Sequence, residues 1–560
     1  MDVNGQYQDV NGPVDSLGNG HGPVSVQVEF SGFPVSAWRF RRGGVKMTTT
    51  VTNDSAAKSG SVPGRRVAVV GAGLGGLSAA VSLAAAGFQV DVFEKNDRVG
   101  GKLNVHSQDG FSFDLGPSIL TLPHIFRELF ARAGRRLEDY VTLCPVRPHW
   151  RNFFEDGRVI DLDPDWERMR QELAKAGPGL EQAYLDFLAY SKKQYNLIDE
   201  GYFRHGLDTM PQLLRHYGWR VFQLDFFRTM QQSVDRRLPN RYLRDIFAFF
   251  IKYVGSSAVR APGFMNLMPH IQYGYDLWYV DGGMYNLARG LERLLKELGA
   301  VIHLNCEVTA MPTADGAVSG VQAGGAFWPV DWVACNMEVI PAYRKLLGSP
   351  PAALRRLRKF EPACSGLVIH LGVDRVYDCL AHHNFFFSGD QRRHFDTVFG
   401  RHELPDDPTL YVVAPSRTDH GVAPAGCDNI KILPHIPWID DERPYTREDY
   451  LQLKEKVLDK VERMGLTDLR QHVVLEHFWT PYDIRDRYGS LGGSIYGVVS
   501  DRWKNFAFKA PKQSREFRNL LFVGGSVNPG GGMPMVVLSG QLAADMIQAR
   551  TAGLEGAVKP

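Results

Sequence analysis

Arg66-Val-Ala-Val-Val70, followed directly by Gly71-Ala-Gly-Leu-Gly-Gly76, is the stretch of sequence that decides the fold. The apolar run is typical of a buried strand, and the glycine cluster is typical of a tight turn. An Ala- and Leu-rich segment with helical spacing follows over residues 77–86, and residues 88–93 have the pattern of a second strand. This order predicts a βαβ unit, whose two parallel strands require the crossover helix.

The glycine spacing within this unit matches the dinucleotide-binding fingerprint. Gly71 permits the tight turn, Gly73 lets a pyrophosphate approach the backbone, and Gly76 lets the helix pack on the strand. The helix N-terminus then faces the phosphates, where its N–H groups stabilise an anion. Glu94 ends the second strand, where its carboxylate can accept hydrogen bonds from ribose hydroxyls. We predict a dinucleotide site, with an ordinary glycine turn as the alternative.

The residues after Glu94 favour FAD over NAD. Arg98-Val-Gly100-Gly101 places an arginine and a glycine pair just after the acidic end of the strand. Such glycines let the chain pass close to the pyrophosphate, and Arg98 could donate charge-assisted hydrogen bonds to it. The alternative for Arg98 is a solvated surface charge.

Composition excludes several classes of partner and site. The 560 residues include 64 Lys plus Arg and 62 Asp plus Glu, and a net charge of +2 gives no case for nucleic acid binding. The six cysteines form no CxxC pair, so we expect no metal site, no disulfide scaffold and a reducing cytosolic setting. No run of about 18 uncharged apolar residues is present, so we expect no membrane-spanning helix.

Six segments carry a resemblance to a known family. They are Arg98-Val-Gly-Gly101, Phe113-Asp-Leu-Gly-Pro-Ser118, Trp278-Tyr-Val-Asp-Gly-Gly-Met284, Thr480-Pro-Tyr-Asp483, Gly493-Ser-Ile-Tyr-Gly497 and Gly524-Gly-Ser-Val-Asn-Pro-Gly-Gly-Gly532. Together with the fingerprint, they make the chain resemble the bacterial-type phytoene desaturase family of carotenoid enzymes, a branch of the amine-oxidase-like flavoproteins. The resemblance extends from about residue 65 to residue 547.

The resemblance implies an α/β fold of the GR2 flavoprotein type. It has a Rossmann-like FAD-binding domain, a mixed-sheet substrate domain and a helical, membrane-associating lobe. The expected segments are 1–64 as a disordered N-terminal extension, 65–150, 281–345 and 501–550 as the FAD-binding domain, 151–280 as the helical, substrate- and membrane-facing lobe, 346–500 as the substrate-binding domain, and 551–560 as a tail. A Thr- and Ser-rich run after Met47 raises the hypothesis that Met47, and not Met1, is the true start.

The resemblance also assigns contacts of the cofactor. The family's motifs place Val308 at the adenine through its backbone, and they assign as contacts of the flavin ring Gly525, Ser526, Gly532 and Met533. A helix starting near Pro534 would point its N-terminus at the flavin and stabilise the anionic reduced form. The alternative is a simple helix-entry loop. The family often has His-Pro-Gly where this sequence has Asn528-Pro-Gly, and a neutral Asn cannot act as an acid or base.

The chemistry expected of such a site is removal of hydride from an apolar C–H bond. A flavin accepts hydride at N5, and a C–H beside a polyene is a suitable donor because the resulting cation is delocalised. The leading prediction is an FAD-dependent desaturase that introduces double bonds into a linear C30 or C40 carotenoid precursor of the phytoene or diapophytoene type. Oxygen or a quinone would reoxidise the flavin. The stretch His149-Trp150-Arg151 is a candidate source of the base, and the resemblance implies Arg151 as the catalytic site residue. Plain surface placement is the alternative for His149 and Arg151.

Two other functions stay open. A related carotenoid oxidase would oxygenate a terminal methyl group of a desaturated C30 or C40 carotenoid, because Gly530-Gly-Gly-Met-Pro-Met535 is similar to that branch. A non-catalytic lipid-escort protein could reuse the fold without a working flavin. The oligomeric state is not predicted by the sequence.

Aromatic residues are dense between residues 202 and 279 and are interleaved with arginines such as Arg215 and Arg228. Apolar rings and basic side chains together are what a monotopic membrane surface requires. We therefore expect a peripheral protein at the cytoplasmic face of a membrane, with a solvated charged face as the alternative.

Overall fold

The computed structural model of the protein describes residues 65–553. The predicted disorder of residues 1–64, the choice between Met1 and Met47, and the predicted tail beyond residue 553 lie outside the described residues.

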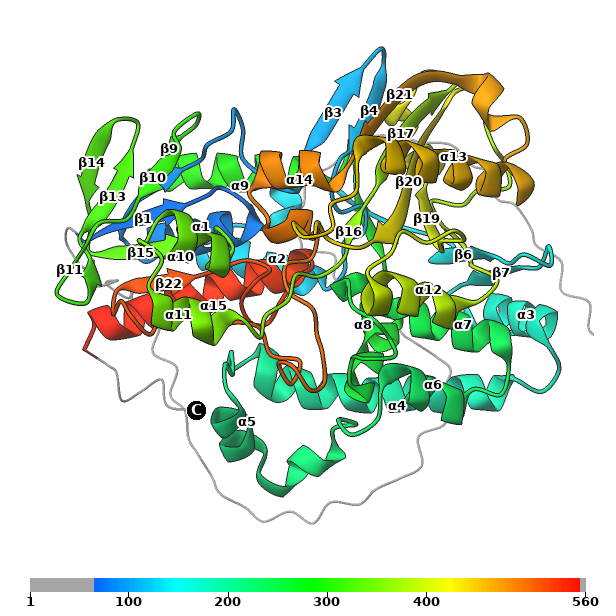
Figure 1. Ribbon diagram of the computed structural model, residues 1–560, viewed down its shortest axis with the longest axis horizontal. Helices are drawn as coiled ribbons and strands as arrows, with labels where there is room; N and C mark the ends of the chain where they lie inside the picture. The colour runs from blue at the N-terminus through cyan, green and yellow to red at the C-terminus, as the bar shows by residue number, and fades with distance from the viewer. Residues whose placement is uncertain (1–64, 554–560) are drawn as a thin grey trace, which may run out of the picture. The chain divides into compact units, whose positions relative to one another are not determined.

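A five-stranded parallel sheet forms the centre of the first lobe, in the order β22-β15-β1-β2-β9 (Figure 1). Its strands are β1 (Arg66–Val70), β2 (Gln89–Phe93), β9 (Val301–His303), β15 (Trp332–Cys335) and β22 (Leu520–Phe522). Successive residues of β1 enter different cores, with Val67 and Val69 on one face and Ala68 and Val70 on the other. A strand buried on both faces needs a continuous apolar run, which is what the sequence provides.

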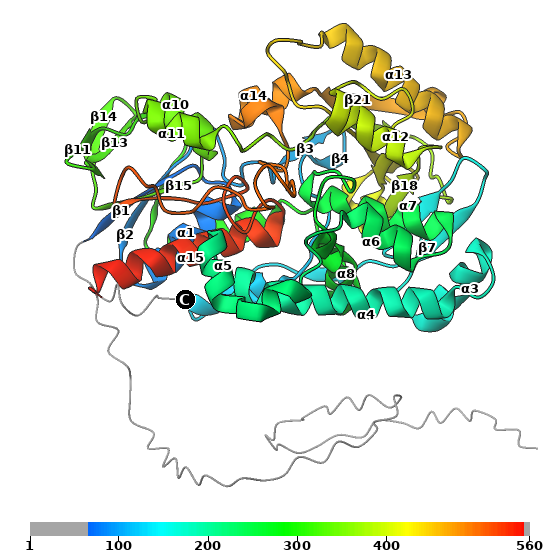
Figure 2. The same ribbon diagram turned by 60° about the horizontal axis from the view of Figure 1, so that its bottom comes forward.

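Helices cover both faces of this sheet, and Figure 2 shows α15 on one side with α10 and α11 on the other. The helices of this lobe are α1 (Leu74–Ala85), α2 (Pro123–Arg132), α9 (Asn286–Glu297), α10 (Val339–Lys345), α11 (Pro351–Leu357) and α15 (Met533–Thr551). The crossover helix α1 packs on α15. A Cβ atom on Gly540 of α15 would lie 2.4 Å from the Gly75 carbonyl oxygen, so the two helix backbones nearly touch.

Small two- and three-stranded antiparallel sheets lie outside the five-stranded sheet. They are β10 (Val308–Ala310), β13 (Gly320–Ala323) and β14 (Ala326–Pro329); β11 (Thr313–Ala314) and β12 (Ala317–Val318); β3 (Val105–Gln108) and β4 (Phe111–Asp114); and β5 (Leu143–Pro145) and β8 (Trp278–Val280).

A mixed eight-stranded sheet forms the second lobe, in the order β21-β17-β20-β19-β18-β6-β7, with β16 also paired to β20. Its strands are β6 (Trp150–Phe153), β7 (Val159–Leu162), β16 (Ser365–Gly366), β17 (Val368–Val373), β18 (His383–Phe386), β19 (Leu410–Val413), β20 (Asp428–Ile436) and β21 (Val473–Trp479). The helix α13 (Arg447–Arg463) buries Leu453, Val457 and Val461 against one face of this sheet. The mixed sheet confirms the predicted fold class of the substrate domain.

A mainly helical segment connects β7 to β8. Its helices are α3 (Trp166–Ala176), α4 (Glu181–Ile198), α5 (Met210–Tyr217), α6 (Met230–Arg237), α7 (Arg241–Phe249) and α8 (Met268–Tyr275), with the short helices η2 (Asp199–Phe203), η3 (Gly218–Gln223), η4 (Phe250–Val254) and η5 (Gly263–Leu267). None of the helices within residues 65–553 is long and apolar enough to cross a bilayer.

The remaining helices are short connectors or caps around the two sheets. They are α12 (Gln391–Asp396), α14 (Pro481–Tyr488), η1 (Leu137–Asp139), η6 (Thr397–Arg401), η7 (Pro415–Arg417), η8 (His420–Val422), η9 (Leu469–His472) and η10 (Leu491–Gly493).

The observed boundary of the helical segment differs from the predicted one at 151–280. Strands β6 and β7 fall inside that range, yet they belong to the eight-stranded sheet, where β6 pairs in parallel with β18. The partner strand lies more than two hundred residues away in sequence, so local patterning gave no sign of the pairing.

Candidate functional site

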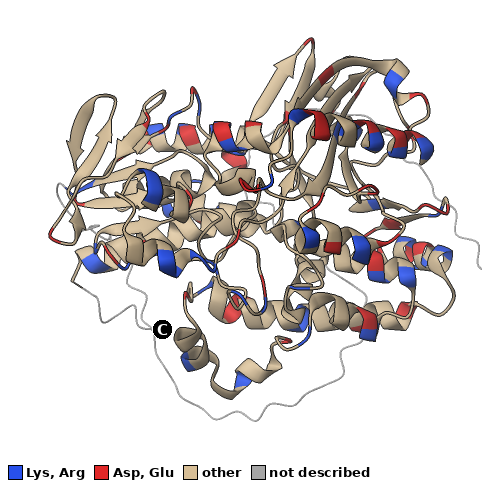
Figure 3. Ribbon diagram, in the orientation of Figure 1, with Lys and Arg blue, Asp and Glu red and all other residues tan. Residues whose placement is uncertain are grey.

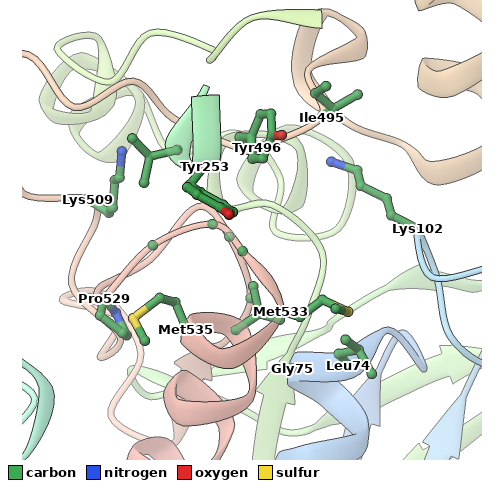
Figure 4. Close-up of a pocket in the computed structure, with 18 of the residues that line it drawn as sticks. Leu74, Gly75, Lys102, Tyr253, Ile495, Tyr496, Lys509, Pro529, Met533 and Met535 are labelled. Carbon is green, nitrogen blue, oxygen red and sulfur yellow. The ribbon is translucent and has the colours of Figure 1, made fainter. Parts of the chain in front are cut away.

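A cavity of about 750 Å³ extends from the glycine turn after β1 to the helical segment. Its wall combines residues from both sheets and from both ends of the chain. Figure 4 shows Leu74, Gly75 and Lys102 from the N-terminal part and Pro529, Met533 and Met535 from the C-terminal part, with Tyr253 and Tyr496 above them. Segments far apart in the sequence therefore meet at one site.

The N-terminal glycines form a narrow channel along the cavity wall. Gly73 bridges to Gly100, and a Cβ atom on Gly101 would lie 3.0 Å from the Gly73 Cα. A Cβ on Gly76 would lie 2.1 Å from the Gly71 carbonyl oxygen, so this glycine allows the helix to pack on the strand and lies under the cavity. The residues Gly71, Gly73, Gly100 and Gly101 line the cavity, as a pyrophosphate site requires.

Glu94 lies at the end of β2 and lines the same cavity. One carboxylate oxygen accepts a hydrogen bond from the Ala72 N–H at 2.8 Å, and the other accepts from the Asn96 N–H at 2.9 Å. The Asn96 side-chain amide donates a third hydrogen bond to this carboxylate at 2.7 Å. A carboxylate has about four acceptor positions, so capacity for about one ribose hydroxyl is left. Val308, the predicted adenine contact, also lines the cavity.

The C-terminal glycine loop lies directly against the N-terminal one. A Cβ atom on Gly75 would lie 2.9 Å from the Gly524 nitrogen. Gly525, Gly532 and Met533 line the cavity, and α15 begins at Met533, so its N-terminus faces the cavity. These residues provide backbone N–H groups and a helix N-terminus where the reduced flavin would carry negative charge. The cavity wall therefore fits both ends of FAD: Glu94 and Val308 suit the adenosine, and the C-terminal glycine loop suits the flavin ring.

Besides Gly76, two predicted cofactor contacts, Arg98 and Ser526, are not part of the cavity wall. The Arg98 side chain is 41% exposed and pairs with Asp97 at 3.1 Å, which raises the pKa of Arg98. It is not part of the cavity wall, where the neighbouring cation is Lys102. Ser526 is buried behind the wall, and its hydroxyl accepts a hydrogen bond from the Val339 N–H. Arg98 thus matches the surface alternative, and Ser526 holds the loop in place.

The candidate base Arg151 also lies outside the cavity wall. Its guanidinium donates two hydrogen bonds to Asp161 on the neighbouring strand, at 2.9 and 2.8 Å, and a third to the Cys379 carbonyl oxygen. The bond to Asp161 raises the pKa of Arg151 further, so this side chain cannot accept a proton. Its contacts instead fasten β6 to β7, away from the cavity wall.

Asn528 is buried and fully used by hydrogen bonds. Its side-chain oxygen accepts from the Lys509 N–H at 2.7 Å and from the Tyr202 hydroxyl, while its amide donates to Asp208 at 3.1 Å. These bonds tie the C-terminal glycine loop to the helical segment. The neutral amide thus replaces the family's frequent histidine with a structural connection.

Three buried lysines on the cavity wall, Lys252, Lys431 and Lys509, were missed by sequence reasoning. Lys431 on β20 donates to the Ser118 hydroxyl at 2.6 Å and to the Gly116 carbonyl oxygen at 2.6 Å, so it clamps the Phe113–Ser118 motif. Burial lowers the pKa of Lys431 to about 8, although the nearby Asp114 carboxylate opposes this. Lys509 donates to the Ser500 hydroxyl at 2.9 Å, and burial lowers its pKa to about 7. For Lys431 the sequence contained one signal of burial, because this lysine stands between two isoleucines, Ile430 and Ile432, in a strand-like run.

The rest of the cavity wall is mainly apolar and leads to the surface through the helical segment. Leu214 and Phe222 line it there, together with Phe227, Trp503 and Phe506 from two neighbouring loops. All five side chains are also exposed, with Phe227 at 70% and Phe222 at 64%. An apolar cavity with an apolar mouth suits a long hydrocarbon chain. No cluster of metal-ligating residues occurs within residues 65–553.

Comparisons with known proteins agree with this geometry. The chain is 58% identical over 488 residues to a 4,4'-diapolycopene oxygenase of Methylomonas sp, covering 87% of this chain and 98% of that relative. It is 47% identical over 492 residues to a 4,4'-diaponeurosporene oxygenase of Staphylococcus aureus (strain USA300), covering 87% and 99%. Both relatives are named oxygenases, which favours the predicted alternative, a carotenoid oxidase, over the leading desaturase prediction.

Solved structures show the same fold at low identity. Putrescine oxidase bound to putrescine has a TM-score of 0.59 and 17% identity, covering 87% of this chain and 99% of that one. An oxidoreductase from Methanosarcina mazei has a TM-score of 0.57 and 16% identity, covering 86% and 99%. Residues 74–548 match the family described as flavin containing amine oxidoreductase. The chain thus belongs to this family of FAD-dependent oxidoreductases.

Proposed function

We propose that this protein is an FAD-dependent carotenoid oxygenase that oxidises a terminal methyl group of a desaturated C30 or C40 carotenoid to an alcohol or aldehyde. The observation that carries the proposal is the apolar cavity, which begins at the flavin-facing loop Gly530–Gly532 and ends at an apolar mouth. The names of the two relatives support the same substrate class.

The residues of this chain have defined tasks in that reaction. The flavin supplies a two-electron acceptor when bound. The glycine loops hold it through the backbone, and the mainly apolar cavity holds one end of the polyene beside Gly532 and Met533. Molecular oxygen or a quinone is the proposed electron acceptor. The oxygen atom of the alcohol comes from O₂ or, with a quinone as acceptor, from a water molecule that adds after hydride removal and releases a proton. A desaturase acting on less unsaturated precursors is the second candidate.

Product analysis tests this proposal. Holoenzyme is incubated with phytoene, diapophytoene and fully desaturated C30 and C40 polyenes, and the products are separated by chromatography and identified by mass. We expect oxygen-containing products from the desaturated polyenes only, because their allylic methyl C–H bonds are the most activated. Incubation under ¹⁸O₂ and, separately, in H₂¹⁸O identifies the oxygen source. New double bonds in phytoene without any alcohol or aldehyde would instead establish the desaturase.

We also propose that the mouth of the cavity docks on the cytoplasmic face of a membrane, where the carotenoid dissolves. Trp219 is 87% exposed and stacks on Phe222 at 5.8 Å between ring centroids, beside the exposed Phe227 and Trp503. The helices α5 and η3 contain no acidic residue, and Figure 3 shows basic positions on them. Arg220 of η3 is paired with Glu200 at 2.6 Å, so Arg215 of α5 is the basic side chain offered to the lipid. Exposed rings and basic side chains around the opening are favourable at an anionic lipid surface.

The membrane proposal predicts a large effect of a triple substitution, Phe222→Ser with Phe227→Ser and Trp503→Ser. Burial of one such side chain contributes about 1.5–3 kcal/mol, so we expect at least about tenfold weaker co-sedimentation with phosphatidylglycerol vesicles. The matched control is Phe327→Ser with Val474→Ser, two exposed apolar residues outside the cavity wall. Equal vesicle binding by both variants would contradict the assignment of this surface.

A further inference from the structure

Lys252 is a buried lysine inside an aromatic cage on the cavity wall. Its ammonium nitrogen lies 4.2 Å from the ring centroid of Tyr253, 4.4 Å from that of Tyr411, 4.8 Å from that of Phe385 and 4.9 Å from that of Trp150. The residue is 4% exposed. Burial alone lowers the pKa of Lys252 well below its usual range, with no carboxylate to oppose it. Among the described residues it has no hydrogen-bond acceptor.

Gln272 on α8 adds a second unused donor to the same wall. Its side chain is fully buried, and its oxygen accepts a hydrogen bond from the Tyr253 hydroxyl at 3.1 Å. Its amide nitrogen has no partner among the described residues. Tyr253 therefore connects the two groups, through its ring to Lys252 and through its hydroxyl to Gln272. Both side chains line the cavity.

Buried donors without acceptors are costly, because they lose their hydrogen bonds to water on folding. A hydrocarbon cannot repair this loss, since it contains no acceptor. An oxygen atom on the ligand can, and a hydroxyl or carbonyl oxygen accepts two hydrogen bonds. The two donors therefore point to a ligand that carries oxygen, in a cavity that is otherwise suited to hydrocarbon.

Lys252 and Gln272 lie close to the flavin-facing loop, so an oxygen atom that they bind belongs to the reacting end of the ligand. A Cβ atom on Gly532, in the flavin-facing loop, would lie 3.7 Å from the Tyr253 carbonyl oxygen. The backbone that carries Lys252 thus packs directly against that loop. A ligand end held by these donors stays beside the flavin site.

We propose that Lys252 and Gln272 form a subsite that binds the oxygen atom of a polyene whose end already carries a hydroxyl or carbonyl group. This inference rests on the proposed function and deepens it. The subsite retains the alcohol formed by a first oxidation, so that the same end is oxidised again before release. It makes the enzyme selective for partly oxidised ends over bare hydrocarbon.

Binding measurements on Lys252→Met and Gln272→Met test this subsite. Gln272→Met keeps the length of the side chain, Lys252→Met shortens it by one atom, and both replacements remove the donor. Holoenzyme is reduced under argon, so that ligands bind without turnover, and dissociation constants for a polyene hydrocarbon and its terminal aldehyde are measured by tryptophan quenching. We expect the wild type to prefer the aldehyde by roughly tenfold or more, as hydrogen bonds to a buried donor pair allow.

In the two variants this preference for the aldehyde is expected to disappear, while hydrocarbon affinity stays within about twofold. The red shift of the bound aldehyde's absorption maximum, caused by hydrogen bonding to its carbonyl, disappears with it. Leu433→Met is the control, because it changes the apolar wall and leaves both donors, so the preference persists. Circular dichroism establishes that each variant is folded.

The outcomes separate the subsite from the function. Unchanged aldehyde preference and an unchanged absorption shift in Lys252→Met and Gln272→Met would show that the subsite is wrong, even while the wild type oxygenates polyenes. Failure of the wild type to bind either polyene, together with no oxygenated product, would overturn both proposals. The subsite is supported if the preference for the aldehyde is lost in Lys252→Met and Gln272→Met but is kept in the wild type and in Leu433→Met.

Discussion

Gly73→Val is expected to give a folded, colourless protein. The residue has φ −72° and ψ 170°, which any L-residue adopts, so the backbone is not strained. Space decides the result instead. A Cβ atom at this position would lie 2.6 Å from the Asn336 amide nitrogen and 3.9 Å from the Gly101 Cα, within the channel that takes the pyrophosphate. Overpacking of such a site costs about 1–3 kcal/mol, so flavin content should fall by about tenfold or more.

The measurement is the flavin-to-protein ratio, from absorbance at 450 and 280 nm after purification with added FAD. Gly389→Val is the matched control, because Gly389 is exposed and a Cβ atom there would have no neighbour closer than 3.8 Å. Gly73→Ala should give an intermediate ratio. If Gly73→Val has the same flavin-to-protein ratio as the wild type, the pyrophosphate of the cofactor does not lie next to this glycine.

Acid is expected to destabilise the protein steeply below about pH 6, because buried histidines stay neutral in the fold. Burial lowers the pKa of His382 to about 3, of His435 to about 3 and of His394 to about 4. In the unfolded chain each histidine binds a proton near pH 6.5. The unfolded state therefore binds more protons as the pH falls from about 6.5, and each such group lowers the free energy of unfolding by about 1.4 kcal/mol per pH unit.

His394→Leu should make the free energy of unfolding fall less steeply with decreasing pH, by the contribution of one histidine. Both ring nitrogens of His394 lack partners, so leucine removes the titrating group without breaking a hydrogen bond. The thermal midpoint of the holoprotein, followed by circular dichroism from pH 7.5 to 4.5, is the measurement. His420→Leu is the control, since His420 is exposed. If both variants lose stability as steeply as the wild type, the acid sensitivity has another source.

The FAD-binding half of the fold could be predicted because its signals are local. The strand, turn and helix around Gly71–Gly76 follow each other directly, and each glycine has a steric task within a few residues. The substrate half depends on pairing between distant strands such as β6 and β18, for which a single sequence contains no direct signal.

The site was predicted in part, for the same reason. Glycines are recognisable because their task lies in the backbone, whereas the role of Lys252 depends on which rings surround it. That lysine follows Phe249-Phe-Ile251, which belongs to the aromatic-rich stretch between residues 202 and 279 that the sequence associates with a membrane surface. These residues are 0–1% exposed, so the run is core. An amphipathic pattern does not distinguish a protein interior from a bilayer, and the exposed rings occur at Trp219, Phe222 and Phe227 instead.

The placement of β22 at the edge of the parallel sheet has a consequence for biosynthesis. This strand and the glycines after it leave the ribosome later than every strand of the mixed sheet, yet they form one side of the flavin site. A nascent chain can complete the mixed sheet earlier, but it has no closed flavin site until α15 emerges. Cofactor capture therefore follows synthesis of α15, and a truncation that removes β22 and α15 abolishes flavin binding while it leaves the strands of the substrate lobe in place.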